Sequence, residues 1–291
     1  MTELCSASSR TREEPLAATA SRVERWLLVE HRGAWGPQSV PSSRLPQTIA
    51  RVLAQTAAQA RARLLMIRRP AGTDSGEGRQ AFAVDSRPGA ERILTRHLAA
   101  DVELGRLAWE DPDWQPYDGP LYLVCTHGRH DRCCALRGRP VAKALAARHP
   151  ESTWECSHIG GDRFAANLIV LPEGLYLGRI EADDVVRVVD ELTAGQLPAG
   201  HVRGRSSLPL PVQAAQHFAR EELHCWGSDA LVPVEQTGAG ADAWRVRFAN
   251  PAVEVVVRYN RAGDGERHLL TCDADEAKAA PLFRQVSLTT G

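Results

Sequence analysis

The sequence predicts an α/β protein, and two observations carry this expectation. Short apolar runs of strand length alternate along the chain with segments in which apolar residues recur at helical spacing. The 291 residues are 43% hydrophobic and 24% charged, which is ordinary for a soluble globular protein. This length allows two domains, or one domain with additions.

Composition also excludes several classes of protein. The net charge of -1 gives no support for a nucleic-acid or anionic-membrane surface, so we expect neither partner. No segment has the roughly 18 uninterrupted apolar residues of a membrane span. Residues 1–22 are polar and lack the apolar core of a secretory signal, so we expect a disordered tail and a cytoplasmic protein. Clustered cysteines in that compartment bind metal or do redox work more often than they form structural disulfides.

The first predicted unit, residues 23–115, reads as an α/β unit. Pro46 suits the first turn of its main helix, because proline lacks the N–H that a helix start leaves unpaired anyway. The expected elements are a strand at 26–30, a helix at 45–63, a strand at 64–67, a loop at 72–78, a strand at 81–85 and a helix at 90–100.

The second predicted unit, residues 116–195, has the order β-α-β-β-β-α, which fits a thioredoxin-like unit. The first unit loosely echoes this order without the cysteines, and we interpret the echo as a decayed duplication. The expected elements are strands at 121–124, 152–158, 166–171 and 175–180, helices at 140–149 and 183–192, and a turn at 172–174.

The last part of the chain is predicted to be a linker followed by a small β-rich unit. Glycine and arginine mark residues 196–210 as the linker, and residues 211–291 form the unit. Its expected elements are a helix at 211–224 and strands at 231–234, 244–248, 253–259 and 268–272.

Soft metal ligands are concentrated in residues 125–162. Thiolate and imidazole donors there form two separated groups, one of them bounded by Gly160 and Gly161, which can converge on one metal centre in the folded chain. The other cysteines, Cys5, Cys225 and Cys272, are isolated, and we expect the last two in the core. The clustered donors are Cys125, Cys133, Cys134, Cys156, His127, His130 and His158.

This region resembles a known family. Residues 123–180 are similar to the sucrase/ferredoxin-like family, a branch of the thioredoxin-like [2Fe-2S] ferredoxins, and a weaker resemblance extends from about residue 20 to the end. It implies a [2Fe-2S] cluster, one-electron transfer and a separate protein as electron donor or acceptor. The matching motifs are Cys125-Thr-His-Gly-Arg-His-Asp-Arg-Cys-Cys134, Trp154-Glu-Cys-Ser-His-Ile-Gly-Gly-Asp-Arg-Phe-Ala165 and Leu171-Pro-Glu-Gly-Leu-Tyr-Leu-Gly-Arg179.

The resemblance also implies a ligand set. Cys125 and Cys134 match the first cysteine pair of such ferredoxins, and His158 and Asp162 fall where the second pair lies. Relatives with imidazole ligands carry H-x-G-G-H here, so Asp162 is a departure, and iron takes carboxylate only uncommonly. We favour Asp162 as the fourth ligand, with Cys156 and Cys133 as alternates. A third interpretation is that Asp162 orients His158.

Several neighbours of this ligand set have predicted supporting roles. Gly160 and Gly161 would let the backbone approach the cluster closely. Arg163 would stabilise an anionic centre. We expect His127 and His130 to be solvated or hydrogen-bonded rather than ligands.

Three other functions are also compatible with the sequence. A thiol-disulfide redox enzyme would use Cys125, Cys133 or Cys134, although the chain lacks Cys-X-X-Cys at a helix start. A structural zinc module would use two cysteines, His158 and Asp162. A metal-free interaction module is the last alternative. The absence of G-x-G-x-x-G and P-loop motifs indicates no nucleotide or flavin site, so we expect an electron-transfer protein rather than an enzyme with its own substrate.

Overall fold

The structure is a computed structural model that describes residues 3–71, 76–260 and 267–291. Part of the loop predicted at 72–78 therefore lies outside the described residues. Among the described helices, none is long and apolar enough to cross a membrane.

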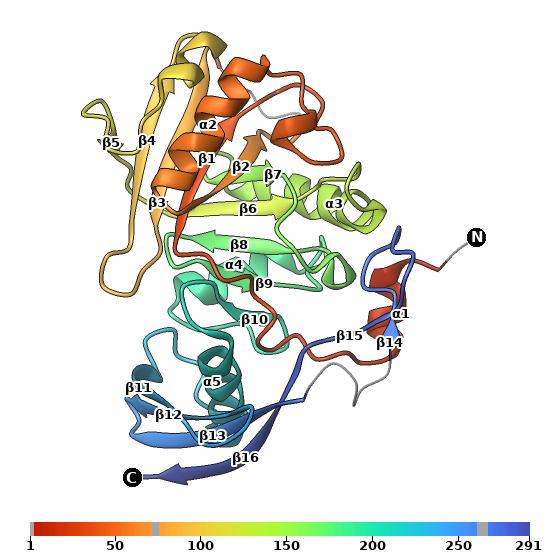
Figure 1. The fold of residues 1–291 in the computed structure, drawn as a ribbon, viewed down its shortest axis with the longest axis vertical. Coiled ribbons are helices and arrows are strands. Elements are labelled where there is room, and N and C mark those ends of the chain that lie inside the picture. Colours follow the sequence, from red (N-terminus) through yellow and green to blue (C-terminus); the bar gives the residue numbers. More distant parts are fainter. Residues whose placement is uncertain (1–2, 72–75, 261–266) are drawn as a thin grey trace.

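A ten-stranded mixed sheet forms the centre of the molecule (Figure 1). Its strand order is β10-β9-β8-β6-β7-β2-β1-β3-β4-β5. The strands are β1 (Arg25–Glu30), β2 (Ala62–Arg68), β3 (Arg79–Asp85), β4 (Arg92–Leu98), β5 (Gln115–Pro116), β6 (Leu121–Cys125), β7 (Thr153–Cys156), β8 (Leu168–Leu171), β9 (Leu175–Leu177) and β10 (Val202–Arg205).

Helices pack on this sheet and on a separate four-stranded sheet, β11-β12-β13-β16. The helices are α1 (Cys5–Thr11), α2 (Gln47–Gln59), α3 (Arg132–Arg148), α4 (Val185–Thr193) and α5 (Leu210–Leu223), with 3-10 turns η1 (Val40–Ser42), η2 (Asp101–Arg106) and η3 (Asp162–Phe164). The remaining strands are β11 (Val232–Gly238), β12 (Ala243–Ala249), β13 (Val253–Asn260), β14 (Arg267–His268), β15 (Lys278–Ala279) and β16 (Leu282–Thr290).

The second unit has the predicted thioredoxin-like arrangement. Strand β6 is central, with β7 parallel to it on one side and β8 antiparallel on the other, and β9 pairs with β8. Helix α3 connects β6 to β7, and α4 follows β9. The predicted α/β class, with an α/β unit before the thioredoxin-like unit and a β-rich element after it, is confirmed.

The first unit repeats this topology. Its order β2-β1-β3-β4 corresponds to β7-β6-β8-β9, with the same parallel and antiparallel pairings. The helix predicted at 90–100 is wrong, because residues 92–98 form strand β4. All seven residues of β4 pair with β3, and this sheet pairing outweighs local helical spacing. The correction brings the two units closer in order than the sequence indicated.

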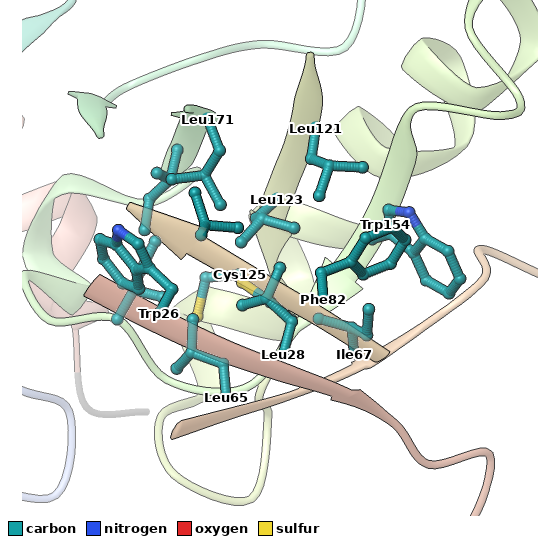
Figure 2. Packing of buried hydrophobic residues seen from close by; sticks show 14 of the residues in the cluster. Trp26, Leu28, Leu65, Ile67, Phe82, Leu121, Leu123, Cys125, Trp154 and Leu171 are labelled. Atoms are coloured by element: carbon teal, nitrogen blue, oxygen red, sulfur yellow. The ribbon is translucent and has the colours of Figure 1, made fainter. Parts of the chain in front are cut away.

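The two units share one sheet and one hydrophobic core. Strand β2 pairs antiparallel with β7, placing Ile67 opposite Cys156. Figure 2 shows side chains of both units interleaved in this core. Phe82 from β3 lies edge-on to Trp154 from β7, with ring centroids 5.7 Å apart.

Two segments differ from the predicted tail and linker. Within 1–22, residues 5–11 form α1, which buries Cys5, Ser6 and Ser9. Within 196–210, residues 202–205 form β10, the edge strand paired with β9. In both cases the contacts that order the segment come from residues distant in sequence, so local composition could not indicate them.

The C-terminal unit is an antiparallel sheet covered by α5. Small residues of α5, among them Ala215 and Ala219, pack on Val246 and Val255 of the sheet. Of the strand predicted at 268–272, only His268 is in a strand, the two-residue β14, and the fourth strand of the sheet is instead β16. Figure 1 shows the β14–β15 pair away from this sheet, beside α1.

A shared core predicts that the two α/β units unfold together. Phe82→Ala should lower the free energy of unfolding by about 3–5 kcal/mol, because it leaves a cavity against Trp154. Urea unfolding followed by circular dichroism and by tryptophan fluorescence checks this. The control Val102→Ala changes an exposed side chain and should stay within about 0.5 kcal/mol. Non-coincident transitions in the two signals would contradict a single core.

Candidate metal centre

The two cysteines of the first predicted pair meet at the end of β6. Cys125 is the last residue of β6, and Cys134 lies in the first turn of α3. Helix α3 begins at Arg132 rather than at Pro140, because the Asp131 carboxylate caps it by accepting the N–H of Cys133 at 2.8 Å. Capping fixes the helix start beside the strand end, and both sulfurs are buried.

The loop after β7 brings an imidazole and a carboxylate to the same place. One donor atom from each of Cys125, Cys134 and His158 lies within 4.8 Å of the others. The Cys134 thiol donates to Oδ1 of Asp162 at 3.0 Å. Nδ1 of His158 is buried and is also 3.0 Å from that oxygen, so the imidazole forms an ion pair with Asp162 when it is protonated. A buried imidazole nitrogen beside two thiols and a carboxylate is suited to metal ligation once these groups lose their protons.

The loop that carries His158 and Asp162 is held from outside by side chains. Each of the four carbonyl groups of residues 158–161 accepts a hydrogen bond from a side chain at 2.9–3.2 Å. The donors, in order along the loop, are Arg63, Ser21, Arg203 and Asn167. Because these donors come from four separate segments, the loop position is fixed by the tertiary structure rather than by its own sequence.

Arg203 is the central member of this group. Its guanidinium is buried and donates to the Gly160 carbonyl at 2.9 Å and to Oδ1 of Asn167 at 2.8 Å. It also donates to the carbonyl and hydroxyl of Thr19. A Cβ on Gly161 would lie 2.3 Å from Nη2 of Arg203, and Gly161 has φ +79°. Glycine is therefore required there for both space and conformation.

The pKa values of four side chains in this group are shifted by burial and by contact with one another; the four are Cys125, Cys134, His158 and Asp162. Contact with Cys134 lowers the pKa of Cys125 to about 5 against the effect of burial, while Cys125 and burial raise the pKa of Cys134. Burial alone would lower the pKa of His158, but Asp162 and Cys125 raise it to about 9. Burial opposes ionisation of Asp162, yet contact with His158 lowers its pKa. Metal binding would have to displace protons from Cys134 and His158.

Two further histidines cover the group. The rings of His130 and His158 stack with centroids 3.6 Å apart, and Nε2 of His130 is 3.8 Å from Oδ2 of Asp162. His127 accepts the N–H of His158 at 3.2 Å and binds the Gly36 carbonyl through Nε2 at 2.8 Å. The expectation that both histidines hydrogen-bond rather than bind metal stays a prediction. Their position over His158 was not visible in the sequence, which showed only a polar loop.

Cys156 and Cys133, the alternates for the fourth ligand, do not belong to the close group of Cys125, Cys134 and His158. Cys156 pairs with Cys125 across strands β7 and β6 and is buried in the shared core. It belongs to no group of three or more close metal donors in the described chain. Cys133 contacts Cys5 and Cys272 instead. Arg163, expected beside the centre, donates to Glu14 at 2.6 Å.

The tight contact at Gly161 predicts a stability difference between two glycines. Gly161 and Gly200 both have positive φ, but nothing lies within 4 Å of a Cβ on Gly200. Gly200→Ala should cost about 1–2 kcal/mol of unfolding free energy, from backbone strain alone. Gly161→Ala should cost at least about 2 kcal/mol more, because Arg203 must move and leave buried carbonyls unpaired. Urea unfolding measures both, and equal losses would show that Arg203 does not fix the loop.

Comparison with known proteins identifies the family. The sequence profile of the sucrase/ferredoxin-like family matches residues 16–204, which spans both α/β units. The chain therefore belongs to the sucrase/ferredoxin-like family. No curated protein matches the chain.

Solved structures similar to this chain include thioredoxin-like [2Fe-2S] ferredoxins from Aquifex aeolicus. One matches with 17% identity and a TM-score of 0.27, covering 32% of this chain and 97% of that one. Two cysteine-to-serine variants match with 18% and 17% identity and TM-scores of 0.26, covering 30% of this chain and all of theirs.

Proposed function

We propose that this protein is a one-electron carrier that holds a [2Fe-2S] cluster with Cys125, Cys134, His158 and Asp162. The observation that carries the proposal is the convergence of two thiols and a buried imidazole nitrogen, with a carboxylate oxygen 3.0 Å from the Cys134 sulfur and from Nδ1 of His158. Membership of a family named for ferredoxin agrees with this chemistry. The cluster would supply reversible one-electron redox chemistry.

The donor set suits iron better than it suits catalysis by a thiol. A thiol-disulfide enzyme needs a sulfur that a substrate disulfide can reach. The side chains of Cys125, Cys133 and Cys134 are at most 1% exposed. His158, by contrast, has a side chain 24% exposed while its Nδ1 is buried. The buried sulfurs are therefore better placed to bind a metal than to react with a substrate disulfide. The ring of His158 connects the buried donors to solvent.

This exposure defines where electrons and protons would pass. His158 and His130, with side chains 24% and 35% exposed, form the surface above Asp162, which is 2% exposed. A partner protein would dock over these rings, since electron transfer requires close approach. The partner is a separate electron donor or acceptor, and the cytoplasmic location expected from the sequence stays a prediction.

Iron and sulfide analysis of ligand variants tests the proposal. Parent protein purified without oxygen should be red-brown and contain two irons and two sulfides per chain, as a [2Fe-2S] cluster requires. Cys125→Ser, Cys134→Ser and His158→Ala should lose the visible charge-transfer bands and most of the iron. Asp162→Ala should retain less iron than Asp162→His, which restores the imidazole of the family pattern.

The matched control is Cys225→Ser, which removes a half-buried thiol that belongs to no close group of donors in the described residues. It should keep full iron and colour. A colourless parent that loses zinc when Cys125 or Cys134 is replaced by serine would favour the structural zinc module. Full iron in His158→Ala would remove His158 from the ligand set.

The exposed imidazole also predicts a pH-dependent potential. Gain of an electron should make the ring nitrogen of His158 that does not bind iron more basic, so that it takes up a proton. The midpoint potential should then fall as pH rises, by up to about 59 mV per pH unit for one electron and one proton. Voltammetry from pH 6 to 9 measures the slope. His158→Cys should flatten it, and a flat line in the parent would contradict the coupling.

A further inference from the structure

A second group of donors lies beside the first and joins three distant parts of the chain. It consists of Cys5 from α1, Cys133 from α3, Cys272 from the segment between β14 and β15, and Asp131. One donor atom of each lies within 4.8 Å of all the others. Cys133 and Cys134 are adjacent on a helix, where successive side chains differ by about 100°, so the two thiols serve different groups.

The sulfur positions suit a single tetrahedral ion. The three Sγ atoms are 3.3, 3.5 and 3.6 Å apart. Zinc bound to thiolates at about 2.3 Å in tetrahedral geometry separates its sulfurs by about 3.8 Å. A disulfide would need about 2.05 Å, so no pair of these sulfurs is bonded.

Asp131 supplies the observation that separates a metal site from ordinary cysteine packing. Its side chain is fully buried, and it forms no ion pair among the described residues. Its carboxylate accepts the N–H groups of Cys133 at 2.8 Å and Cys272 at 2.7 Å, and Oδ2 is 3.8 Å from Sγ of Cys5. The N-terminus of α3, which this carboxylate caps, offers only a partial positive charge. Burial of the carboxylate stays costly, and a divalent cation would supply the rest of the compensation.

We propose that Cys5, Cys133, Cys272 and Asp131 bind one zinc ion that fastens both end segments of the chain to the start of α3. Three thiols would give up their protons to the solvent, and no electron would be transferred. Zinc fits because it accepts three thiolates with a carboxylate in a closed tetrahedral site. Such a site is structural, since all four positions are taken by the protein. The proposal does not depend on the identity of the first centre.

Zinc and iron analysis of full-length variants tests this proposal. Parent protein should hold one zinc per chain, measured by plasma mass spectrometry. Cys5→Ser and Cys272→Ser should weaken zinc binding, measured against a chromophoric chelator, by more than the roughly 10- to 100-fold that loss of an outer hydrogen-bonding partner costs. Cys225→Ser should match the parent. Cys125→Ser should keep its zinc whatever happens to its iron.

A second measurement on the parent avoids any dependence on variant folding. Iodoacetamide labelling followed by peptide mapping should find Cys5, Cys133 and Cys272 protected with zinc bound and alkylated after chelation, while Cys225 reacts in both states. Three outcomes would overturn the proposal: zinc binding weaker than micromolar in the reduced parent, full zinc in Cys5→Ser, or a disulfide among the three cysteines in protein kept reduced.

Discussion

The burial of one guanidinium group is the interaction on which the candidate centre depends. Arg203 joins the N-terminal segment through Thr19, the glycine loop through Gly160, and the start of β8 through Asn167, the residue before that strand. Burial lowers its pKa to about 10, so the group stays charged at neutral pH. Burying a charge without a carboxylate partner is costly, and carbonyl, amide and hydroxyl oxygens compensate here. The aromatic faces of Phe164 and Tyr176 add to this, with centroids 5.2 and 5.3 Å away.

The fold class and the donor-rich segment could be predicted from the sequence because both depend on the local pattern of residues. The strand ending at Cys125 and the loop from His158 to Asp162 follow from apolar runs and glycines. The role of Arg203 could not be predicted, because its local sequence resembles a linker. Strand β4 could not be predicted either, because the spacing of its apolar residues does not indicate its pairing with β3. Cys5 and Cys272 meet although they are 267 residues apart, and no local pattern indicates such a contact.

The two α/β units have the same strand order but contribute differently. The second unit carries the donors at the end of its central strand. In the first unit, the segment after the corresponding strand provides the carbonyls of Gly36 and Pro37, which contact His127 and His130. The unit without cysteines thereby positions the histidines above the centre. Of two units with the same topology, one carries the candidate centre and the other contacts the histidines beside it.

The contact between Cys5 and Cys272 sets the order in which the two groups of donors can form during synthesis. Every donor of the first centre, and Arg203 behind it, has been made before the C-terminal sheet exists. Cys272 is synthesised after every donor of the first centre, whereas Cys5 is synthesised before them. Domains generally fold in the order in which they emerge, so the first centre can form on a nascent chain. The three-sulfur group can close only after Cys272 has emerged, so it would form later than the first centre.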